Sequence, residues 1–196
     1  LVIAEQGLGD AVQFVRYAAL IKRQSQARVL LHCSARLHAL LASAAGIDEL
    51  LAGPVTQPFD YYLHLLSAPA VFGTTLDTVP ADVPYLSVDP LRVEHWRREL
   101  AKFDGYKIAI AWQGNPQYED DVRRSVPLAA FAPLADIPGV RLFSLQKQHG
   151  LEQLAAFRER LSIVDLGPRL DEEGQAFVDT ASVLKNMDLV VTSDSA

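Results

Sequence analysis

The chain has 196 residues, of which 49% are hydrophobic and 21% charged, a composition that suits one large or two smaller globular domains. A formal net charge of −6 argues against nucleic acid or an anionic membrane as the main partner, and no apolar run approaches the roughly 18 residues of a membrane span. The single cysteine, Cys33, excludes an internal disulfide, and we expect a cytoplasmic protein.

The first half of the sequence alternates predicted strands and helices. An apolar strand at residues 1–5 leads through a glycine turn into a helix predicted from about Asp10 to Ser25, where apolar residues recur three or four positions apart. A second helix is predicted from Ala35 to Ala45. Further strands are expected at "ARVLLHC" (27–33), "DELLA" (48–52) and "FDYYLHL" (59–65). Cys33 ends one of these strands, and we interpret it as core filler and not as a nucleophile.

The middle of the chain, residues 67–90, is rich in proline and poor in periodicity, and it is predicted to be a functional loop plus an interdomain linker. A helix over about 91–103 follows, and "DGYKIAIAWQGNP" then restarts the strand–helix pattern. The later strands are expected at "VRLFSL" (140–145), "SIVDLG" (162–167) and "MDLVVTS" (187–193), with helices near 128–134, 151–161 and 177–185. Apolar strands alternating with helices predict an α/β protein with two parallel sheets. We therefore expect domains at 1–90 and 106–196, joined by a linker helix at 91–105.

Polar side chains follow the first strand of the first predicted domain. In "EQGLGD", Gly7 and Gly9 would allow a tight turn and a close approach of another molecule to the backbone. Asp10 falls at the start of a helix, where the helix dipole favours a carboxylate. Two interpretations of Asp10 remain open at this point: a catalytic carboxylate, or a simple helix N-cap.

Three loops of the second predicted domain carry candidate phosphate ligands. Arg123 and Arg124 in "WQGNPQYEDDVRRSVP" suit a diphosphate, although the acidic run at 119–121 offers them structural ion pairs instead. Gln146 and Lys147 follow a strand, and Lys147 could hold a phosphate as a point charge. The last loop, "TSDSA", follows a buried strand at a position where a helix N-terminus would bind phosphate.

Several classes of site are absent from the sequence. The five histidines lack metal-ligand spacing, and there is no G-x-S-x-G or Walker motif. The glycine pair also fails the dinucleotide fingerprint, because Val12 stands where a third glycine is needed. We expect neither a metal nor a cofactor.

Taken in order, "EQGLGDAVQFVRYAAL", "FGTTLDTVPADVPYL", "IAWQGNP…RRSVPL", "FSLQK" and "LVVTSDSA" resemble glycosyltransferase family 9, the ADP-heptose:lipopolysaccharide heptosyltransferase-like enzymes. The similarity is greatest to the branch often associated with tetratricopeptide repeats. It implies a GT-B architecture of two Rossmann-like domains, the second cut short in this chain, so that the piece alone would be inactive. One departure is the acidic "QYEDD" loop, where the family usually has basic residues.

The resemblance implies an inverting, metal-independent sugar transfer with Asp10 as general base. It implies an ADP- or UDP-linked sugar donor, a glycan, lipid-linked or protein acceptor, no nucleic acid, and tetratricopeptide repeats upstream; it also leaves room for peripheral membrane association. The alternative is a non-catalytic GT-B-like scaffold module beside such repeats. The intact Asp10 favours the enzyme and the acidic loop the scaffold. The implied substrate- and donor-binding residues are Gln6, Gly7, Gly9, Arg123, Arg124, Gln146, Lys147, Asp194 and Ser195.

Overall fold

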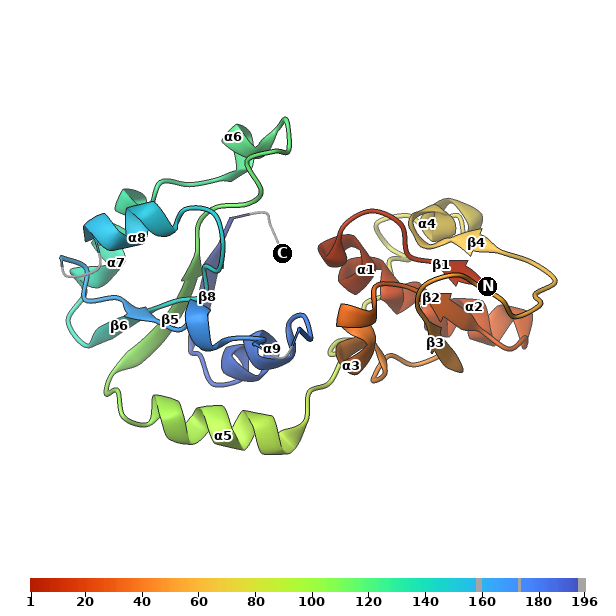
Figure 1. The fold of residues 1–196 in the computed structure, drawn as a ribbon, viewed down its shortest axis with the longest axis horizontal. Coiled ribbons are helices and arrows are strands. Elements are labelled where there is room, and N and C mark those ends of the chain that lie inside the picture. Colours follow the sequence, from red (N-terminus) through yellow and green to blue (C-terminus); the bar gives the residue numbers. More distant parts are fainter. Residues whose placement is uncertain (158–159, 173, 194–196) are drawn as a thin grey trace. The chain divides into compact units, whose positions relative to one another are not determined.

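The computed structural model describes residues 1–157, 160–172 and 174–193 and divides the chain into two compact units (Figure 1). Unit 1 contains Leu1–Val88 together with Gly174–Phe177. Unit 2 contains the described residues from Asp89 to 172 and from Val178 onward. A short segment of the second half of the sequence therefore belongs to the first unit, where the Ala176 amide donates to the Arg36 carbonyl oxygen at 2.7 Å.

Unit 1 is built on a four-stranded parallel sheet in the order β3-β2-β1-β4. The central strand β1 sets Val2 beside Leu31 on one side and Leu63 on the other. The predicted parallel α/β architecture is confirmed for this half. The strands are β1 (Val2–Ile3), β2 (Leu30–His32), β3 (Glu49–Leu51) and β4 (Leu63–His64).

The helices of unit 1 are shorter than the sequence predicted. The single helix expected from Asp10 to Ser25 begins at Leu8 and is divided by a 3₁₀ turn. This turn lets Val15 and Tyr17, two positions apart, both enter the core, whereas a regular α-helix would place them nearly opposite each other. The helical segments are α1 (Leu8–Phe14), η1 (Val15–Tyr17), α2 (Ala18–Ser25), η2 (Ala35–Leu37), α3 (His38–Leu41), η3 (Leu65–Ser67) and α4 (Ala68–Val71).

Cys33 lies in the core of unit 1, only 4% exposed, as the sequence predicted. Burial raises the pKa of its thiol from the ordinary 9.0 to about 11. We expect the folded protein to resist a disulfide reagent at pH 8 and to react fully once unfolded in guanidinium chloride. The unfolded thiol ionises first, so its contribution to stability should disappear as the pH rises from about 9 to about 11. Measured by urea unfolding, Cys33→Ala should reduce this loss of stability at alkaline pH. In the reagent test, a thiol that reacts at once in the folded protein would contradict the burial.

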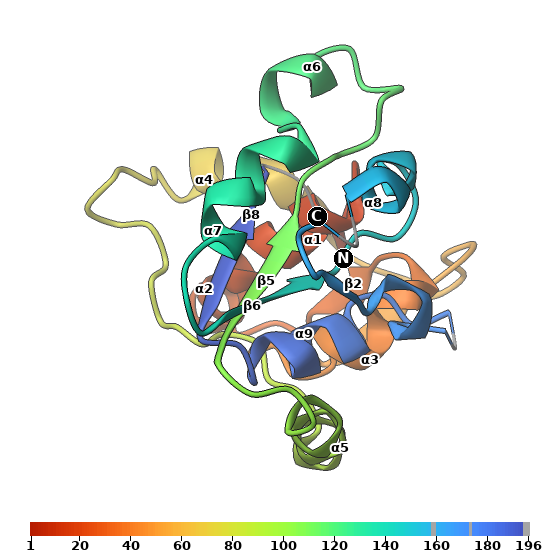
Figure 2. The same cartoon turned by 90° about the vertical axis from the view of Figure 1, so that its left-hand side faces the viewer.

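Unit 2 contains a second four-stranded parallel sheet, in the order β7-β6-β5-β8. Neighbouring residues of β6 serve opposite faces: Leu142 packs beneath α8 and Phe143 against α5 and α9. Helices α7 and α8 cover one face and α5 and α9 the other (Figure 2). The strands are β5 (Tyr106–Ala111), β6 (Val140–Ser144), β7 (Val164–Asp165) and β8 (Leu189–Thr192). The helical segments are α5 (Pro90–Leu100), α6 (Asp121–Arg124), η4 (Leu128–Phe131), α7 (Ala132–Ala135), α8 (Leu151–Phe157), η5 (Gly167–Arg169) and α9 (Val178–Leu184).

Helix α5, expected as a linker, is fastened to α9 inside unit 2. The Asp179 carboxylate accepts hydrogen bonds from Trp96 Nε1 at 3.1 Å and Arg92 Nη1 at 3.0 Å. Its second oxygen accepts from the Asp171 amide at 3.0 Å. Burial would raise the pKa of the Asp179 carboxyl, but the hydrogen bonds from Trp96, Arg92 and Asp171 outweigh burial and hold the pKa below its ordinary value.

Asp179→Ala should therefore lower the free energy of unfolding of unit 2 by about 2 kcal/mol, because it leaves the buried Trp96 indole N–H without its acceptor and removes the ion pair with Arg92. Tryptophan fluorescence during urea unfolding measures this directly, since Trp96 and Trp112 both lie in unit 2. Asp179→Asn, which retains an acceptor, should lose less. Equal stability of Asp179→Ala and the parent would show that the contact contributes nothing.

Candidate active site

The loop after β1 carries the candidate residues of unit 1. Gln6 adopts the left-handed conformation with a φ of 72°, whereas Gly7 is extended and Gly9 lies inside α1. The prediction that the two glycines make the tight turn was therefore wrong, since the chain reverses at Gln6. The absence of a side chain at Gly7 instead lets the Asp10 carboxylate lie close to the backbone, because a Cβ there would lie 3.1 Å from Asp10 Oδ2.

Asp10 lies in the first turn of α1 and is partly exposed. Its Oδ2 accepts a hydrogen bond from the Gly7 amide at 2.9 Å, which caps the helix. Among the described residues, none donates to the other oxygen, Oδ1. Gly7 is the N-cap of α1 and Asp10 the third helical residue, so Asp10 caps the helix through the N-cap amide and is not itself the N-cap. The same carboxylate still has an oxygen available to accept a proton.

Glu5, which the sequence analysis missed, joins the loop after β1 to the segment after β4. Its carboxylate accepts from the Leu65 amide at 3.1 Å and the Leu66 amide at 3.3 Å, at the start of η3. His64 Nδ1 lies 3.8 Å from Glu5 Oε2. The available signal was an acidic residue directly after a buried strand, where parallel strands end at one edge. Glu5 therefore fixes the backbone immediately before Gln6 and Gly7.

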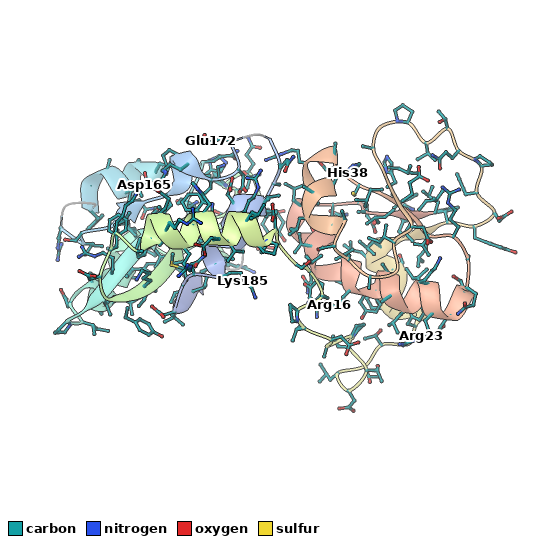
Figure 3. All side chains as sticks on the ribbon, turned by 90° about the horizontal axis from the view of Figure 1, so that it is seen from below. Arg16, Arg23, His38, Asp165, Glu172 and Lys185 are labelled. Atoms are coloured by element: carbon teal, nitrogen blue, oxygen red, sulfur yellow. The ribbon has the colours of Figure 1, made fainter. Side chains whose placement is uncertain are left out.

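Arg16, in the 3₁₀ turn η1 that follows α1 and labelled in Figure 3, holds the long loop of unit 1 in place. Its Nη1 donates to the Pro80 carbonyl oxygen at 3.2 Å and its Nη2 to the Tyr85 hydroxyl at 3.0 Å. The guanidinium also lies 4.4 Å from the centre of the Tyr85 ring, a cation–π distance. Tyr17 adds a hydrogen bond from its hydroxyl to Thr74 at 3.1 Å. The region predicted as loop and linker is thus attached to unit 1 over part of its length.

In unit 2, the Gln146 side chain connects two loops at the carboxyl edge of the sheet. Its Oε1 accepts from the amides of Trp112 at 3.0 Å and Gln113 at 3.2 Å. Its Nε2 donates to the carbonyl oxygens of Gln113 at 2.7 Å and His149 at 2.8 Å. The residue is 7% exposed and every hydrogen-bonding position of its amide is occupied. In this structure Gln146 therefore positions the backbone and has no free group for a ligand.

Lys147, the neighbour of Gln146, is exposed and donates to the Leu170 carbonyl oxygen. A lysine ammonium carries three hydrogens, so this contact leaves two for another acceptor. Lys147 can therefore serve as a point charge at this edge of the sheet.

The two arginines of the loop after β5 differ in their surroundings. Arg124 Nε donates to Asp121 Oδ1 at 3.0 Å, and its guanidinium lies 4.6 Å from the Tyr118 ring centre. Asp121 is buried and also accepts from Ser125 Oγ at 2.9 Å. Arg123 is exposed and 3.5 Å from Asp120. The structural ion-pair interpretation holds for Arg124, and Arg123 is the arginine with its guanidinium largely in solvent.

The candidate loop after β8 is described only as far as Ser193, so Asp194 and Ser195 lie outside the described residues. Ser193 is buried, and its amide donates to the Ala111 carbonyl oxygen at 3.0 Å. This bond brings the end of β8 beside the start of the arginine-containing loop. Across the described ranges, no cluster of three or more metal-ligating side chains occurs. Nor does any helix there have the length and apolarity of a membrane span.

Comparison with known proteins places this fold. The E. coli ADP-heptose lipopolysaccharide heptosyltransferase II superposes with a TM-score of 0.66 over 99% of this chain and 78% of its own, at 15% sequence identity. The fold is GT-B-like. Protein FlbA of Caulobacter vibrioides is 27% identical over 146 residues, which are 70% of this chain. The chain spans 23% of the length of FlbA. No family model matches the present chain.

Proposed function

We propose that the chain belongs to an inverting, metal-independent glycosyltransferase that moves a sugar from an ADP- or UDP-linked donor to a glycan, lipid-linked or protein acceptor. The observation that carries the proposal is the likeness of 99% of the chain to a heptosyltransferase fold. The position of Asp10, at the carboxyl edge of a parallel sheet with one oxygen unoccupied among the described residues, adds chemical support. We place the enzyme in the cytoplasm and, through its resemblance to the repeat-associated branch, beside tetratricopeptide repeats.

In this mechanism Asp10 removes the proton of the acceptor hydroxyl as its oxygen attacks the anomeric carbon. The new carbon–oxygen bond forms while the bond from that carbon to the diphosphate oxygen breaks, and the nucleoside diphosphate leaves with the electron pair. Arg123 and Lys147 are proposed to stabilise the charge that develops on the phosphates. Asp194 and Ser195 are proposed to contact the donor.

The alternative function is a non-catalytic module that keeps the fold as a scaffold. The observation in its favour is that Arg124 and Gln146, two of the expected donor ligands, are already occupied by internal contacts. A domain without a donor would need no free polar groups at this edge.

A thermal-shift and calorimetric panel on the full-length protein separates the two functions. ADP, UDP, GDP and their common sugar conjugates should include one nucleotide family that raises the melting temperature. Arg123→Ala combined with Lys147→Ala should weaken its binding about tenfold or more, because charge-assisted phosphate contacts are lost. Gln148→Ala, an exposed neighbour, provides the control. Absence of any nucleotide binding would favour the scaffold.

A further inference from the structure

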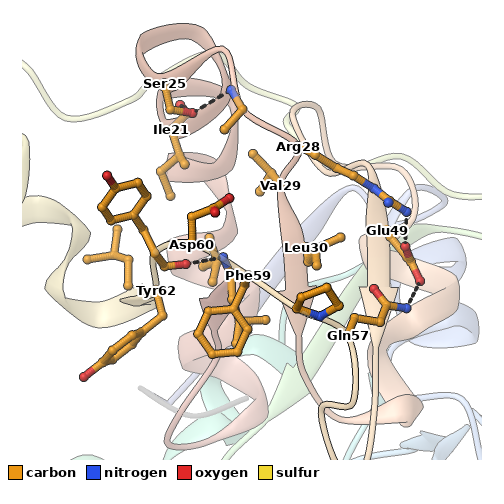
Figure 4. A pocket seen from close by; sticks show the side chains of 16 residues that line it. Ile21, Ser25, Arg28, Val29, Leu30, Glu49, Gln57, Phe59, Asp60 and Tyr62 are labelled. Atoms are coloured by element: carbon orange, nitrogen blue, oxygen red, sulfur yellow. Dashed lines mark hydrogen bonds and ion pairs between the residues drawn. The ribbon is translucent and has the colours of Figure 1, made fainter.

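A pocket of about 610 Å³ opens at the amino edge of the unit 1 sheet (Figure 4). Val2, Val29 and Leu63, at or next to the starts of three parallel strands, line it, and Ile21 and Ser25 of α2 form another wall. Asp10 follows the opposite, carboxyl end of the same sheet. The volume is within the range of about 300–1,000 Å³ typical of small-molecule sites. The pocket is therefore separate from the proposed transfer site.

Three aromatic side chains at this pocket remain exposed to solvent. Phe59 is 46% exposed, Tyr61 86% and Tyr62 63%. Phe59 and Tyr62 meet edge to face, with ring centres 6.5 Å apart. Aromatic rings gathered in the open at a concave site are typical of binding surfaces, because each offers a broad apolar face and tyrosine adds a hydroxyl.

Polar groups with fixed geometry complete the pocket. Glu49 accepts from Arg28 Nη2 at 2.5 Å and from Gln57 Nε2 at 2.8 Å, so these three side chains form one ordered wall. Asp60 is exposed, and no described residue donates a hydrogen bond to its carboxylate. The pocket thus combines aromatic faces with two carboxylates, an amide and a guanidinium within one cavity.

We propose that this pocket binds a neutral saccharide unit. A pyranose ring presents C–H groups on its faces, which pack on aromatic rings, and hydroxyls at its rim, which bond to carboxylate, amide and guanidinium groups. A purely apolar ligand would cover the Asp60 carboxylate, to which no described residue donates, without offering it a hydrogen bond. Asp60 also disfavours an anion, whereas the charge of Glu49 is already matched by Arg28. The inference does not depend on the proposed function, because it requires neither a donor nor a transfer step.

Saturation-transfer NMR and calorimetry on the full-length protein test this site, with glucose, N-acetylglucosamine, cellobiose and N,N′-diacetylchitobiose as probes. We expect at least one probe to bind, and Tyr61→Ala and Tyr62→Ala each to weaken its binding about tenfold or more, as truncation of an aromatic hot spot does. Both rings are more than half exposed, so their loss leaves the core intact. Tyr106→Ala, a half-exposed tyrosine of unit 2, should bind as the parent does.

Three results would overturn the assignment: no binding of any probe, binding that only Asp10→Ala removes, or shielding of Tyr61 and Tyr62 without sugar. The second would place the saccharide at the transfer site. The third, measured by photochemically induced nuclear polarisation of tyrosine, would mean that another part of the protein fills the pocket.

Discussion

Asp10→Asn should reduce the proposed sugar transfer by the full-length protein by about 10²–10⁴-fold, the usual contribution of a general base, which is the role proposed for Asp10. Asparagine keeps a side-chain oxygen that can accept the Gly7 amide, the bond that caps α1 at 2.9 Å, but it cannot take a proton from the acceptor hydroxyl. The loss should therefore appear in kcat, with donor binding and the melting temperature nearly unchanged. The rate is measured as the formation of nucleoside diphosphate from the nucleotide-sugar donor at saturating acceptor.

Asp10→Ala separates capping from catalysis. It removes both the proposed base and the hydrogen bond to the Gly7 amide, so it should show the same loss of activity and lower the free energy of unfolding by about 1 kcal/mol. Glu5→Gln is the comparison variant. Glu5 holds the neighbouring backbone through the Leu65 and Leu66 amides, and it is not expected to accept the proton of the acceptor hydroxyl. Retention of full activity in Asp10→Asn would remove Asp10 from the mechanism and leave it as a cap alone.

The periodicity of the sequence predicted the two parallel sheets because buried parallel strands are almost continuously apolar, as in "KIAIAW" and "RVLLHC". It also placed Asp10 at the start of a helix and Cys33 in a core, since both follow from local pattern. The left-handed turn fell on Gln6 instead of a glycine. Glycine adopts the left-handed conformation most readily, but other residues can adopt it too. The sequence alone therefore could not show which residue of the loop makes the turn.

Long-range contacts were beyond the sequence. Nothing local marks residues 174–177 as part of the first unit, because that placement depends on the packing of Ala176 among residues more than a hundred positions away. Gln146 is a similar case. Its position after a strand predicted a contact with the donor. Its side-chain amide is instead fully hydrogen-bonded to backbone groups of Trp112 and Gln113, 34 and 33 positions earlier, and of His149, three positions later. By contrast, the ion-pair partner of Arg124 is Asp121, only three residues away, and the sequence predicted this structural role as the alternative to phosphate binding.

The Gln146 amide should therefore contribute strongly to the stability of unit 2. Gln146→Leu, similar in size, should lower the free energy of unfolding by about 3–4 kcal/mol. The buried Trp112 amide loses its partner at a cost of about 1–3 kcal/mol, and the partly buried Gln113 amide and the Gln113 and His149 carbonyl oxygens cost less because water can reach them. Urea unfolding followed by tryptophan fluorescence measures the change, with an unaltered m value as the test of a common transition. Gln148→Leu, at an exposed position two residues on, should change stability by less than about 0.5 kcal/mol.

Hydrogen exchange distinguishes a local loosening from a general loss of stability. In the parent protein the Trp112 and Gln113 amides both bond to Gln146 Oε1 and should exchange slowly. In Gln146→Leu they should exchange faster than the lowered global stability requires, whereas the amides in the middle of β5 should follow the global change alone. If the Trp112 and Gln113 amides stayed as protected as before, other groups would hold this loop. If they open as expected, the segment 114–124 loses its anchor, and the donor binding proposed above should weaken in the same variant, although the hydrogen-bonding positions of the Gln146 amide are already occupied.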